Sequence, residues 1–345
     1  MQSATRIVDR VDVSSGTNGE VIDTFLVTDV GGTHARIALA TAPTGDASIQ
    51  LQHYRTYRCA DYSGLDEILA GFVAECGIVP PRHGVVASAG YALADGSVLG
   101  ANLPWKLELE PIRQRFGMCR LGLVNDFEAV AHAAPNMAGQ EVLHLSGPEQ
   151  MQDGAVLVLG PGTGLGAALW TPRPGGEAWV LPTEAGQAAL APASDAEFAL
   201  LQALRAAQGH VSIESLLSGP GLLTLYRTLC ALRGVAPILA LPAEVSAAAQ
   251  TGHDTLAREA LEIFCGLLGS VVGDMVLLYG IRGGVYLAGG FLPRLARVLA
   301  ASQFRARMLD KGKMRPALEQ VPVKLVEHGQ LGVIGAANWF VQQRN

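Results

Sequence analysis

Residues 24–42 read TFLVTDVGGTHARIALATA, and this stretch decides the fold. An apolar run rich in β-branched residues leads into a glycine pair, and a second apolar run with alternating polarity follows. Two strand patterns around a tight turn predict a β-hairpin whose tip lies at Asp29–Thr33. Paired glycines let backbone N–H groups approach an anion closely, so this tip is a candidate phosphate-binding loop. An ordinary hairpin turn is the alternative.

The chain repeats this pattern further on. Residues 155–170, AVLVLGPGTGLGAALW, again predict a strand, a glycine-rich turn and a strand, with Gly162, Thr163 and Gly164 in the turn. A single loop of this kind is weak evidence, and neither loop matches a P-loop or a Rossmann fingerprint. Two such loops fit a nucleotide held by two domains, because each domain would supply one. The sequence therefore predicts an α/β protein with a weak internal duplication.

The bulk composition excludes several classes of protein. The 345 residues are 49% hydrophobic and 16% charged, which indicates a globular chain long enough for two domains. The formal net charge is -6 and no basic tract occurs, so we expect no nucleic-acid partner and no membrane partner. No apolar run of about 18 residues is free of glycine or charge breaks. Residues 1–23 are expected to form a flexible N-terminal extension.

The cysteines give a further expectation about the compartment. Their number is odd, they are scattered, and no CxxC pair occurs, so neither a zinc ribbon nor a thioredoxin-like site is indicated. This usage predicts reduced, mostly buried thiols in a cytoplasmic protein. The five positions are Cys59, Cys76, Cys119, Cys230 and Cys265.

Polar residues stand at the ends of several apolar runs. Asn125 and Asp126 end the strand pattern of CRLGLVNDF and lead into a helical pattern. Such a pair commonly caps a helix, but this Asp is also placed to accept a proton from a hydroxyl nucleophile that the Asn orients. Glu184 and Gln187 lie in TEAGQ, and Glu214 lies in SIESLLSGPG. The simpler interpretations of the two glutamates are a solvated loop carboxylate and a carboxylate at a helix N-terminus.

Two further stretches contain site candidates. GANLPW contains Asn102, which is a turn residue before a proline in the simpler interpretation. LAGGF places Gly289 and Gly290 after a buried strand, where a flat backbone could pack against a purine or simply turn into a helix. Asp29 could hold Mg²⁺ through water, because this cation prefers carboxylate oxygen. SDAEFALLQALRAAQ opens with the Ser-x-x-Glu pattern of a helix capping box.

Seven stretches together resemble one protein family. DVGGTHARIALA, VNDFEAVAHAAP, GPGTGLG, LPTEAG, HVSIESLLSGPGLLTLYR, LAGGF and LGVIGAA occur in the order seen in bacterial ATP-dependent glucokinases of the actin/hexokinase ATPase superfamily. The resemblance covers about residues 24 to 340. It implies a two-domain, ribonuclease-H-like α/β fold with an interdomain cleft that closes on sugar and ATP, and it implies a homodimer. We expect a small α/β domain at 24–135, completed by a C-terminal helix at 330–345, and a large α/β domain at 136–329.

The resemblance also implies roles for individual residues. Asp126 resembles the general base that takes the proton from the sugar 6-hydroxyl, and Asp29 resembles the carboxylate on the Mg²⁺ side. The other implied positions are the hexose ligands Asn102, Asn125, Asp126, Glu184, Gln187 and Glu214, the phosphate-binding residues Gly31, Gly32, Thr33, Gly162, Thr163 and Gly164, and the adenosine-site residues Gly289 and Gly290.

The chain departs from the family pattern at Gln187. The family loop resembles E-G-G-H, whereas this chain has Glu-Ala-Gly-Gln at 184–187. A glutamine bonds vicinal hydroxyls as donor and acceptor without ever carrying charge. We predict an ATP-dependent kinase that converts glucose to glucose 6-phosphate. Another hexose, a weakened sugar-sensing homologue, and polyphosphate or ADP as the phosphoryl donor stay open.

Three other classes are set aside. A sugar-responsive transcriptional regulator would need a DNA-binding domain, and residues 1–23 are too short and carry no helix-turn-helix pattern. A Rossmann oxidoreductase would need a helix and an acidic residue after a glycine loop, which neither loop has. A chaperone-like or actin-like ATPase would share the phosphate loops but not the set of sugar ligands.

Overall fold

The computed structural model describes residues 24–42, 49–89, 91–92, 98–99, 103–137, 141–173, 178–327 and 329–343. The predicted extension at 1–23 and the candidate Asn102 lie outside the described residues. The chain divides into two compact units: unit 1 comprises residues 1–133 and 330–345, and unit 2 comprises residues 134–329. The domain limits expected from the sequence stay a prediction about independently folding parts.

Unit 1 is built on a five-stranded sheet with the order β3-β2-β1-β4-β7. β1 and β2 form the predicted hairpin, and Val30 pairs with Ala35 next to its tip. β3 extends the antiparallel part, whereas β4 is parallel to β1 and β7 is parallel to β4. The strands are β1 (Thr24–Val30), β2 (His34–Thr41), β3 (Gln50–Arg58), β4 (His83–Ser88) and β7 (Arg120–Asn125), with a separate pair formed by β5 (Tyr91–Ala92) and β6 (Val98–Leu99).

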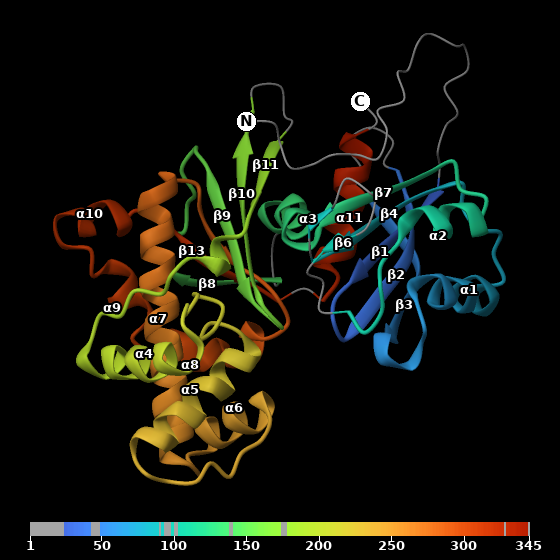
Figure 1. The fold of residues 1–345 in the computed structure, drawn as a ribbon. Coiled ribbons are helices and arrows are strands. Elements are labelled where there is room, and N and C mark those ends of the chain that lie inside the picture. Colours follow the sequence, from blue (N-terminus) through green and yellow to red (C-terminus); the bar gives the residue numbers. More distant parts are fainter. Residues whose placement is uncertain are drawn as a thin grey trace. The chain divides into compact units, whose positions relative to one another are not determined.

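Helices cover both faces of the unit 1 sheet (Figure 1). Successive side chains of β1 point to opposite faces: Leu26 packs in one cluster with Phe72, and Phe25 packs in another with Ala129. On the second face a methyl group on Gly335 would overlap the Ala129 backbone, so the two helices there cross in close contact. The helices are α1 (Leu65–Cys76) and α2 (Leu109–Arg115) on the first face, α3 (Asp126–Ala133) and α11 (Leu331–Gln342) on the second, and the 3₁₀ turn η1 (Cys59–Asp61).

Unit 2 repeats this strand arrangement and adds one edge strand. The order of its sheet is β11-β10-β9-β12-β13-β8. β9 and β10 form the second predicted hairpin, with Pro161 paired to Leu165, and β12 and β13 continue the sheet in parallel. Both sheets thus join three antiparallel strands to two parallel ones, which is the duplication that the glycine loops indicated. The strands are β8 (Val142–Ser146), β9 (Val156–Pro161), β10 (Leu165–Pro172), β11 (Ala178–Thr183), β12 (Gly284–Leu287) and β13 (Val323–Val326).

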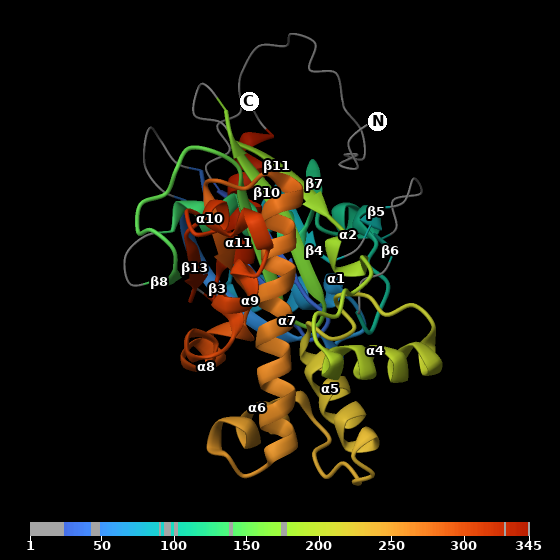
Figure 2. The ribbon, with the colours of Figure 1, turned by 90° about the vertical axis from the view of Figure 1, so that its left-hand side faces the viewer.

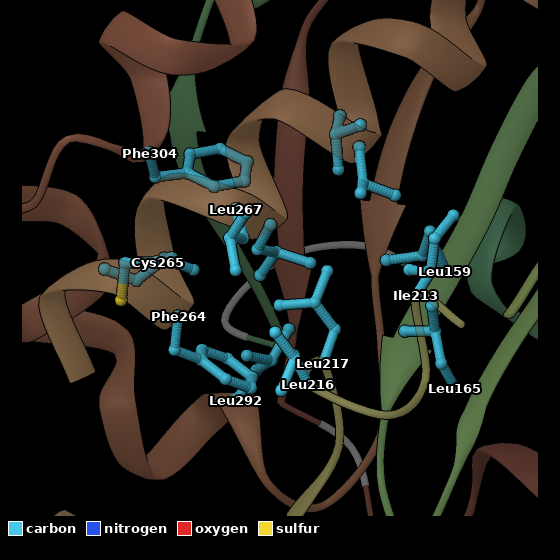
Figure 3. Close-up of a cluster of buried hydrophobic side chains, with 14 of the residues drawn as sticks. Leu159, Leu165, Ile213, Leu216, Leu217, Phe264, Cys265, Leu267, Leu292 and Phe304 are labelled. Atoms are coloured by element: carbon cyan, nitrogen blue, oxygen red, sulfur yellow. The ribbon is translucent and has the colours of Figure 1, made fainter. Parts of the chain in front are cut away.

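The helices of unit 2 gather around α7. Figures 1 and 2 show α7 as one long helix, with α5 and α6 beside its lower part. Phe264 and Leu267 of α7 belong to one buried cluster with the strand residue Leu159 (Figure 3). The elements are α4 (Asp195–Gln208), α5 (Gly219–Leu232), α6 (Pro242–Thr251), α7 (Thr255–Tyr279), α8 (Ala296–Ala301), α9 (Phe304–Leu309) and α10 (Arg315–Leu318), with 3₁₀ turns η2 (Ala134–Asn136), η4 (Ala185–Gln187), η5 (Leu292–Leu295) and η6 (Gly312–Met314).

By length and composition alone, α7 could cross a membrane. It has 25 residues, and the mean hydropathy of its apolar window is 1.9. However, 72% of that window is buried inside the protein, as in the core helix of a soluble protein. It is the one helix with these properties in the described part of the chain, and it is weak evidence for a membrane span.

The segment HVSIESLLSGPGLLTLYR becomes helical only at Gly219. α5 starts at Gly219, because the Ser218 hydroxyl accepts a hydrogen bond from the Gly221 N–H at 3.0 Å and so caps the helix. The residues before Ser218 form turns. Glu214 therefore lies on a connecting segment, and its interpretation as a carboxylate at a helix N-terminus is wrong.

The capping box expected at Ser194 is only half formed. The Ser194 hydroxyl accepts a hydrogen bond from the Glu197 N–H at 3.3 Å, which is the first half of the box. The Glu197 carboxylate instead accepts hydrogen bonds from the Ala193 N–H at 2.7 Å and from Arg307 at 2.6 Å. The distant arginine thus holds the side chain that the local pattern assigned to the cap.

The cysteines are free thiols. Cys59, Cys230 and Cys265 are buried, as predicted. Cys76 is half-buried and Cys119 is exposed, so the expectation of mostly buried thiols holds for three of the five.

Candidate active site

The tip of the first hairpin, Gly31–Thr33, is held through its carbonyl groups. The Cys59 N–H donates to the Thr33 carbonyl at 2.9 Å, and the Cys59 thiol donates to the Gly31 carbonyl at 3.3 Å. The Trp105 indole N–H donates in turn to the Cys59 carbonyl at 3.1 Å. The Thr33 side chain is exposed at the tip. Neutral donors thus hold the carbonyl groups of this loop in place, which fits a rigid phosphate-binding turn.

Asp29 lies just before this tip and is paired. It stands opposite Arg36 in the β1–β2 ladder and accepts a hydrogen bond from Arg36 Nη1 at 3.0 Å. Its side chain is 17% exposed, and a methyl group on Gly332 of α11 would come within 2.6 Å of its carboxylate. Burial raises the pKa of Asp29, and the Arg36 charge opposes this shift.

This pairing bears on the predicted magnesium site. Because one carboxylate oxygen of Asp29 is bonded to Arg36, the residue fits Mg²⁺ as a partner through water better than as a direct ligand. In the described part of the chain no group of three or more His, Cys, Asp or Glu side chains could hold a metal ion. An ion that stays mostly hydrated and is bound with nucleotide phosphates needs no such group.

The strand β7 passes directly into α3 at Asn125 and Asp126. Asn125 Oδ1 accepts hydrogen bonds from the N–H groups of Phe127 at 2.9 Å and Glu128 at 3.1 Å, so the helix-cap interpretation of Asn125 is confirmed. Asp126 Oδ1 also accepts from the Phe127 N–H, at 2.9 Å. The N-terminus of a helix favours the ionised carboxylate, which is the form that accepts a proton.

Two buried titratable side chains follow on the same helix. Glu128 accepts a hydrogen bond from the Trp339 indole of α11 at 3.2 Å, and burial raises its pKa to about 7. One turn later, burial lowers the pKa of His132 to about 4. Neither residue is among the candidates predicted from the sequence, although two polar residues four apart on an apolar helix are a signal that could have found them.

The tip of the second hairpin, Gly162–Gly164, is closed and anchored within unit 2. The Gly162 N–H donates to the Gly164 carbonyl at 2.7 Å, and the Gly219 N–H of α5 donates to the Gly162 carbonyl at 2.8 Å. Gly289 has φ +99°, and a methyl group there would lie 3.4 Å from the Pro161 carbonyl at the end of β9. The structure therefore brings the second predicted phosphate loop and the first predicted adenosine-site glycine together.

Three predicted sugar ligands lie close to this second tip. Gln187 Nε2 donates to Glu214 Oε1 at 3.1 Å, and the Leu165 N–H donates to Glu214 Oε2 at 2.8 Å. Burial raises the pKa of Glu184, and the negative charge of Glu214 raises it further. Glu184, Gln187 and Glu214 thus form one polar cluster beside the phosphate loop.

A family model described as glucokinase matches residues 26–343. The chain belongs to the glucokinase family. The glucokinase-like protein of Xylella fastidiosa is 50% identical over 324 residues, which are 94% of this chain and 96% of that protein. The crystal structure of a glucokinase from an Antarctic psychrotroph is 35% identical, covers 92% of this chain and 98% of its own, and has a TM-score of 0.78. The ROK family glucokinase of Streptomyces griseus, solved with glucose and AMPPNP, is 19% identical and covers 92% of this chain and 98% of its own; its TM-score of 0.61 indicates a likeness of fold.

These relatives confirm the predicted glucokinase resemblance and the α/β, actin/hexokinase-like fold.

The roles of individual residues stay predictions. Arg36 and Cys59 join the set as supports of the first tip. The pairing of Arg36 with Asp29 could have been predicted from the register of the hairpin. No pattern in the neighbouring sequence indicated that Cys59 would contact the tip. Unit 1 holds Asp29, Gly31, Gly32, Thr33, Asn125 and Asp126, and unit 2 holds Gly162, Thr163, Gly164, Glu184, Gln187, Glu214, Gly289 and Gly290.

Proposed function

We propose that this protein is a glucokinase that transfers the γ-phosphoryl group of ATP to the 6-hydroxyl of glucose. One observation carries the proposal beyond family membership: the polar cluster of Glu184, Gln187 and Glu214 lies directly beside the glycine tip at Gly162–Gly164. Sugar-binding chemistry and phosphate-binding chemistry thus adjoin each other within one unit. A binding module for sugar alone would not need such a loop.

The reaction assigns a step to residues of each unit. The sugar oxygen forms a bond to the γ-phosphorus, the bond from that phosphorus to the ADP oxygen breaks, and Asp126 accepts the proton of the hydroxyl group. Glu184 and Glu214 accept hydrogen bonds from sugar hydroxyls, which orients the nucleophile. Asn125 Nδ2 is suited to donate to the sugar while its oxygen caps α3. Asn102 is a further proposed ligand.

The nucleotide is assigned to the two tips. Gly31, Gly32 and Thr33 of unit 1 and Gly162, Thr163 and Gly164 of unit 2 would contact phosphate oxygens, and Gly289 and Gly290 would contact adenosine. Asp29 would hold Mg²⁺ through water. The ion, when bound with ATP, neutralises charge that develops on the phosphate oxygens. A role in glycolysis, a homodimer and a cytoplasmic location are further proposals, which rest on the family resemblance and on the free thiols.

A second candidate is a kinase for another hexose. It is favoured by Gln187, whose amide already donates to Glu214 and so presents fewer free donors to the sugar. Both candidates are tested by measuring ADP release with ATP and magnesium against glucose, mannose, fructose, glucosamine and N-acetylmannosamine. We expect glucose to give the highest kcat/KM. A higher value for another sugar would replace glucose in the proposal, and no turnover with any of them, despite binding of AMPPNP, would overturn the kinase assignment.

A further inference from the structure

Three segments of unit 2 that are separate in the sequence meet at the Glu214 carboxylate. Glu214 lies on the connecting segment between α4 and α5. One of its oxygens accepts the N–H of Leu165, the residue that directly follows the Gly162–Gly164 tip, at 2.8 Å. The other accepts the amide of Gln187, in the loop that carries the proposed sugar ligands, at 3.1 Å. One carboxylate therefore bridges the phosphate tip and the sugar loop.

The backbone around Glu214 makes the same two connections. The Glu214 N–H donates to the Gly186 carbonyl in the sugar loop at 2.8 Å. At the other end of the segment, the Gly219 N–H donates to the Gly162 carbonyl in the phosphate tip at 2.8 Å. The Ser218 hydroxyl donates to the Glu214 carbonyl at 2.9 Å and closes the segment on itself. A displacement of either loop is thus transmitted through hydrogen-bonded backbone as well as through the side chain.

The bridge is also closely packed. A methyl group on Gly164 would overlap the Glu214 carboxylate. A methyl group on Gly186 would come within 2.5 Å of the Leu165 carbonyl. The approach at Gly186 is to backbone and so requires glycine, whereas a side chain at position 164 would have to displace the Glu214 carboxylate.

The chemistry of the bridge makes it sensitive to a bound sugar. An ionised carboxylate accepts about four hydrogen bonds, and the residues that the structure describes supply two of them to Glu214. The remaining lone pairs suit sugar hydroxyls, which would then bind the atoms that hold the Leu165 N–H. Glu184 is close enough for the Glu214 charge to raise its pKa, so a sugar that donates to both glutamates would relieve their repulsion.

We propose that Glu214 is a coupling residue: it holds the phosphate tip through Leu165, Gln187 positions it, and sugar bound to it strengthens nucleotide binding to the same unit. The inference deepens the proposed function and rests on it. Coupling of this kind is reciprocal, so nucleotide must strengthen sugar binding by the same factor. A Glu214 that is only a sugar ligand would leave the affinity of the sugar-free protein for nucleotide unchanged.

The test is calorimetric titration of the full chain with magnesium and AMPPNP, with and without saturating glucose. In the absence of glucose, Glu214→Ala should weaken AMPPNP binding about tenfold, because the tip loses a charge-assisted hydrogen bond. Glu214→Gln keeps an acceptor for the Leu165 N–H and should retain the affinity within about threefold. Glu184→Gln is the matched comparison. Within the described residues no hydrogen bond joins the Glu184 carboxylate to the tip, so this change should alter AMPPNP affinity without glucose less than about twofold.

Gln187→Ala tests the positioning role at an exposed side chain, where misfolding is not expected. The affinity for AMPPNP with glucose, divided by the affinity without glucose, should fall toward one. The affinity measured without glucose should change less than this ratio. Equal AMPPNP affinity of the wild type and Glu214→Ala without glucose, or tighter binding from loss of the negative charge, would overturn the coupling and leave the kinase assignment intact. Absence of AMPPNP binding to the wild type would overturn both. Circular dichroism spectra of each variant establish that it is folded.

Discussion

The two units carry the same hairpin but support its tip in different ways. In unit 1 the carbonyls of Gly31 and Thr33 accept hydrogen bonds from Cys59, so neutral donors hold the tip. In unit 2 the N–H of Leu165 donates to the Glu214 carboxylate, so a charged acceptor holds it. Similar loop sequences thus have different electrostatic surroundings. Burial raises the pKa of the Cys59 thiol, so the first support keeps this donor protonated, whereas the second contains a group that also suits a sugar hydroxyl.

The units also differ in the carboxylates among their predicted site residues. Unit 1 places Asp126 at the start of α3, where the helix N-terminus favours its ionised form. Unit 2 places a pair of carboxylates, Glu184 and Glu214, in which the charge of one raises the pKa of the other. Under the proposed function, this difference corresponds to a division of tasks: Asp126 of unit 1 would take the proton, and the two glutamates of unit 2 would orient the sugar. Four experiments compare the two units, and the first tests that division directly.

The largest expected effect is at Asp126. Asp126→Ala should lower kcat by about a thousandfold, because a positioned general base contributes about 10²–10⁴-fold. The matched change in unit 2, Glu184→Ala, should act mainly by raising KM for glucose. Steady-state kinetics with glucose and ATP separate the two effects. A lower affinity for glucose without a loss of kcat in Asp126→Ala would break the division of tasks.

The second experiment compares the buried glutamates of the two units. Glu197 in unit 2 is paired with Arg307 at 2.6 Å, and its side chain is 4% exposed. Glu197→Gln leaves the arginine charge without its partner and should lower the free energy of unfolding by about 3 kcal/mol. Glu128 in unit 1 is bonded instead to the neutral Trp339 indole. Glu128→Gln keeps that acceptor and should stabilise the protein at pH 8.

The sign at Glu128 follows from its pKa, which burial raises from 4.5 to about 7. The protonated carboxyl stabilises the fold below the unfolded pKa, and this contribution is lost as the pH rises through about 7. At pH 8 the ionised carboxylate therefore costs about 3 kcal/mol, which Glu128→Gln recovers. Urea unfolding at pH 5 and pH 8 measures both variants. Destabilisation by Glu128→Gln at pH 8 would contradict the expected neutral environment.

The third experiment makes the same change at two positions of one tip. A methyl group on Gly164 overlaps Glu214, whereas one on Gly162 has no neighbour within 4 Å. Both alanine variants are expected to raise KM for ATP. Only Gly164→Ala should also raise KM for glucose, by about tenfold, because it displaces the glutamate. A similar KM for glucose in the two variants would mean that Glu214 accommodates the methyl group without losing its contribution to glucose binding.

The smallest expected effect concerns pH. Burial and the Glu214 charge raise the pKa of Glu184, so this residue is protonated at a higher pH than an ordinary glutamate. The protonated form is a weaker acceptor, and KM for glucose should therefore rise as the pH falls toward that pKa, by about threefold or more. Glu184→Gln should flatten the profile. A profile unchanged by the substitution would assign the titration to another group.

Local patterns predicted the parts of the fold that depend on local geometry. The two hairpins, the passage from β7 to α3 and the capping by Asn125 were all predicted from neighbouring residues. The start of α5 was not predicted. The spacing of apolar residues before Gly219 is typical of a helix, but the backbone of this segment forms hydrogen bonds to the sugar loop instead. If that segment were assumed to be a helix, the contacts that Glu214 makes with the two loops would not be predicted.

The site was predicted as a list of residues, and its connections were not. Gln187 was expected to face the sugar, yet its amide donates to Glu214. Cys59 was counted only as a thiol, yet it bonds to both ends of the first glycine turn. In each case the partner lies far along the chain, so no window of sequence contained both members.

The sequence by itself determined where the chain turns and which side chains stand at the strand ends. These properties depend on glycine, on apolar alternation and on cap residues, which act on the backbone within a few positions. Only the tertiary structure decided the state of those side chains: Asp29 is half-buried against α11, Glu214 bridges two loops, and Glu128 is buried beside the Trp339 indole. Charge and hydrogen bonding depend on which groups surround an atom in space, and the folded chain alone brings those groups together.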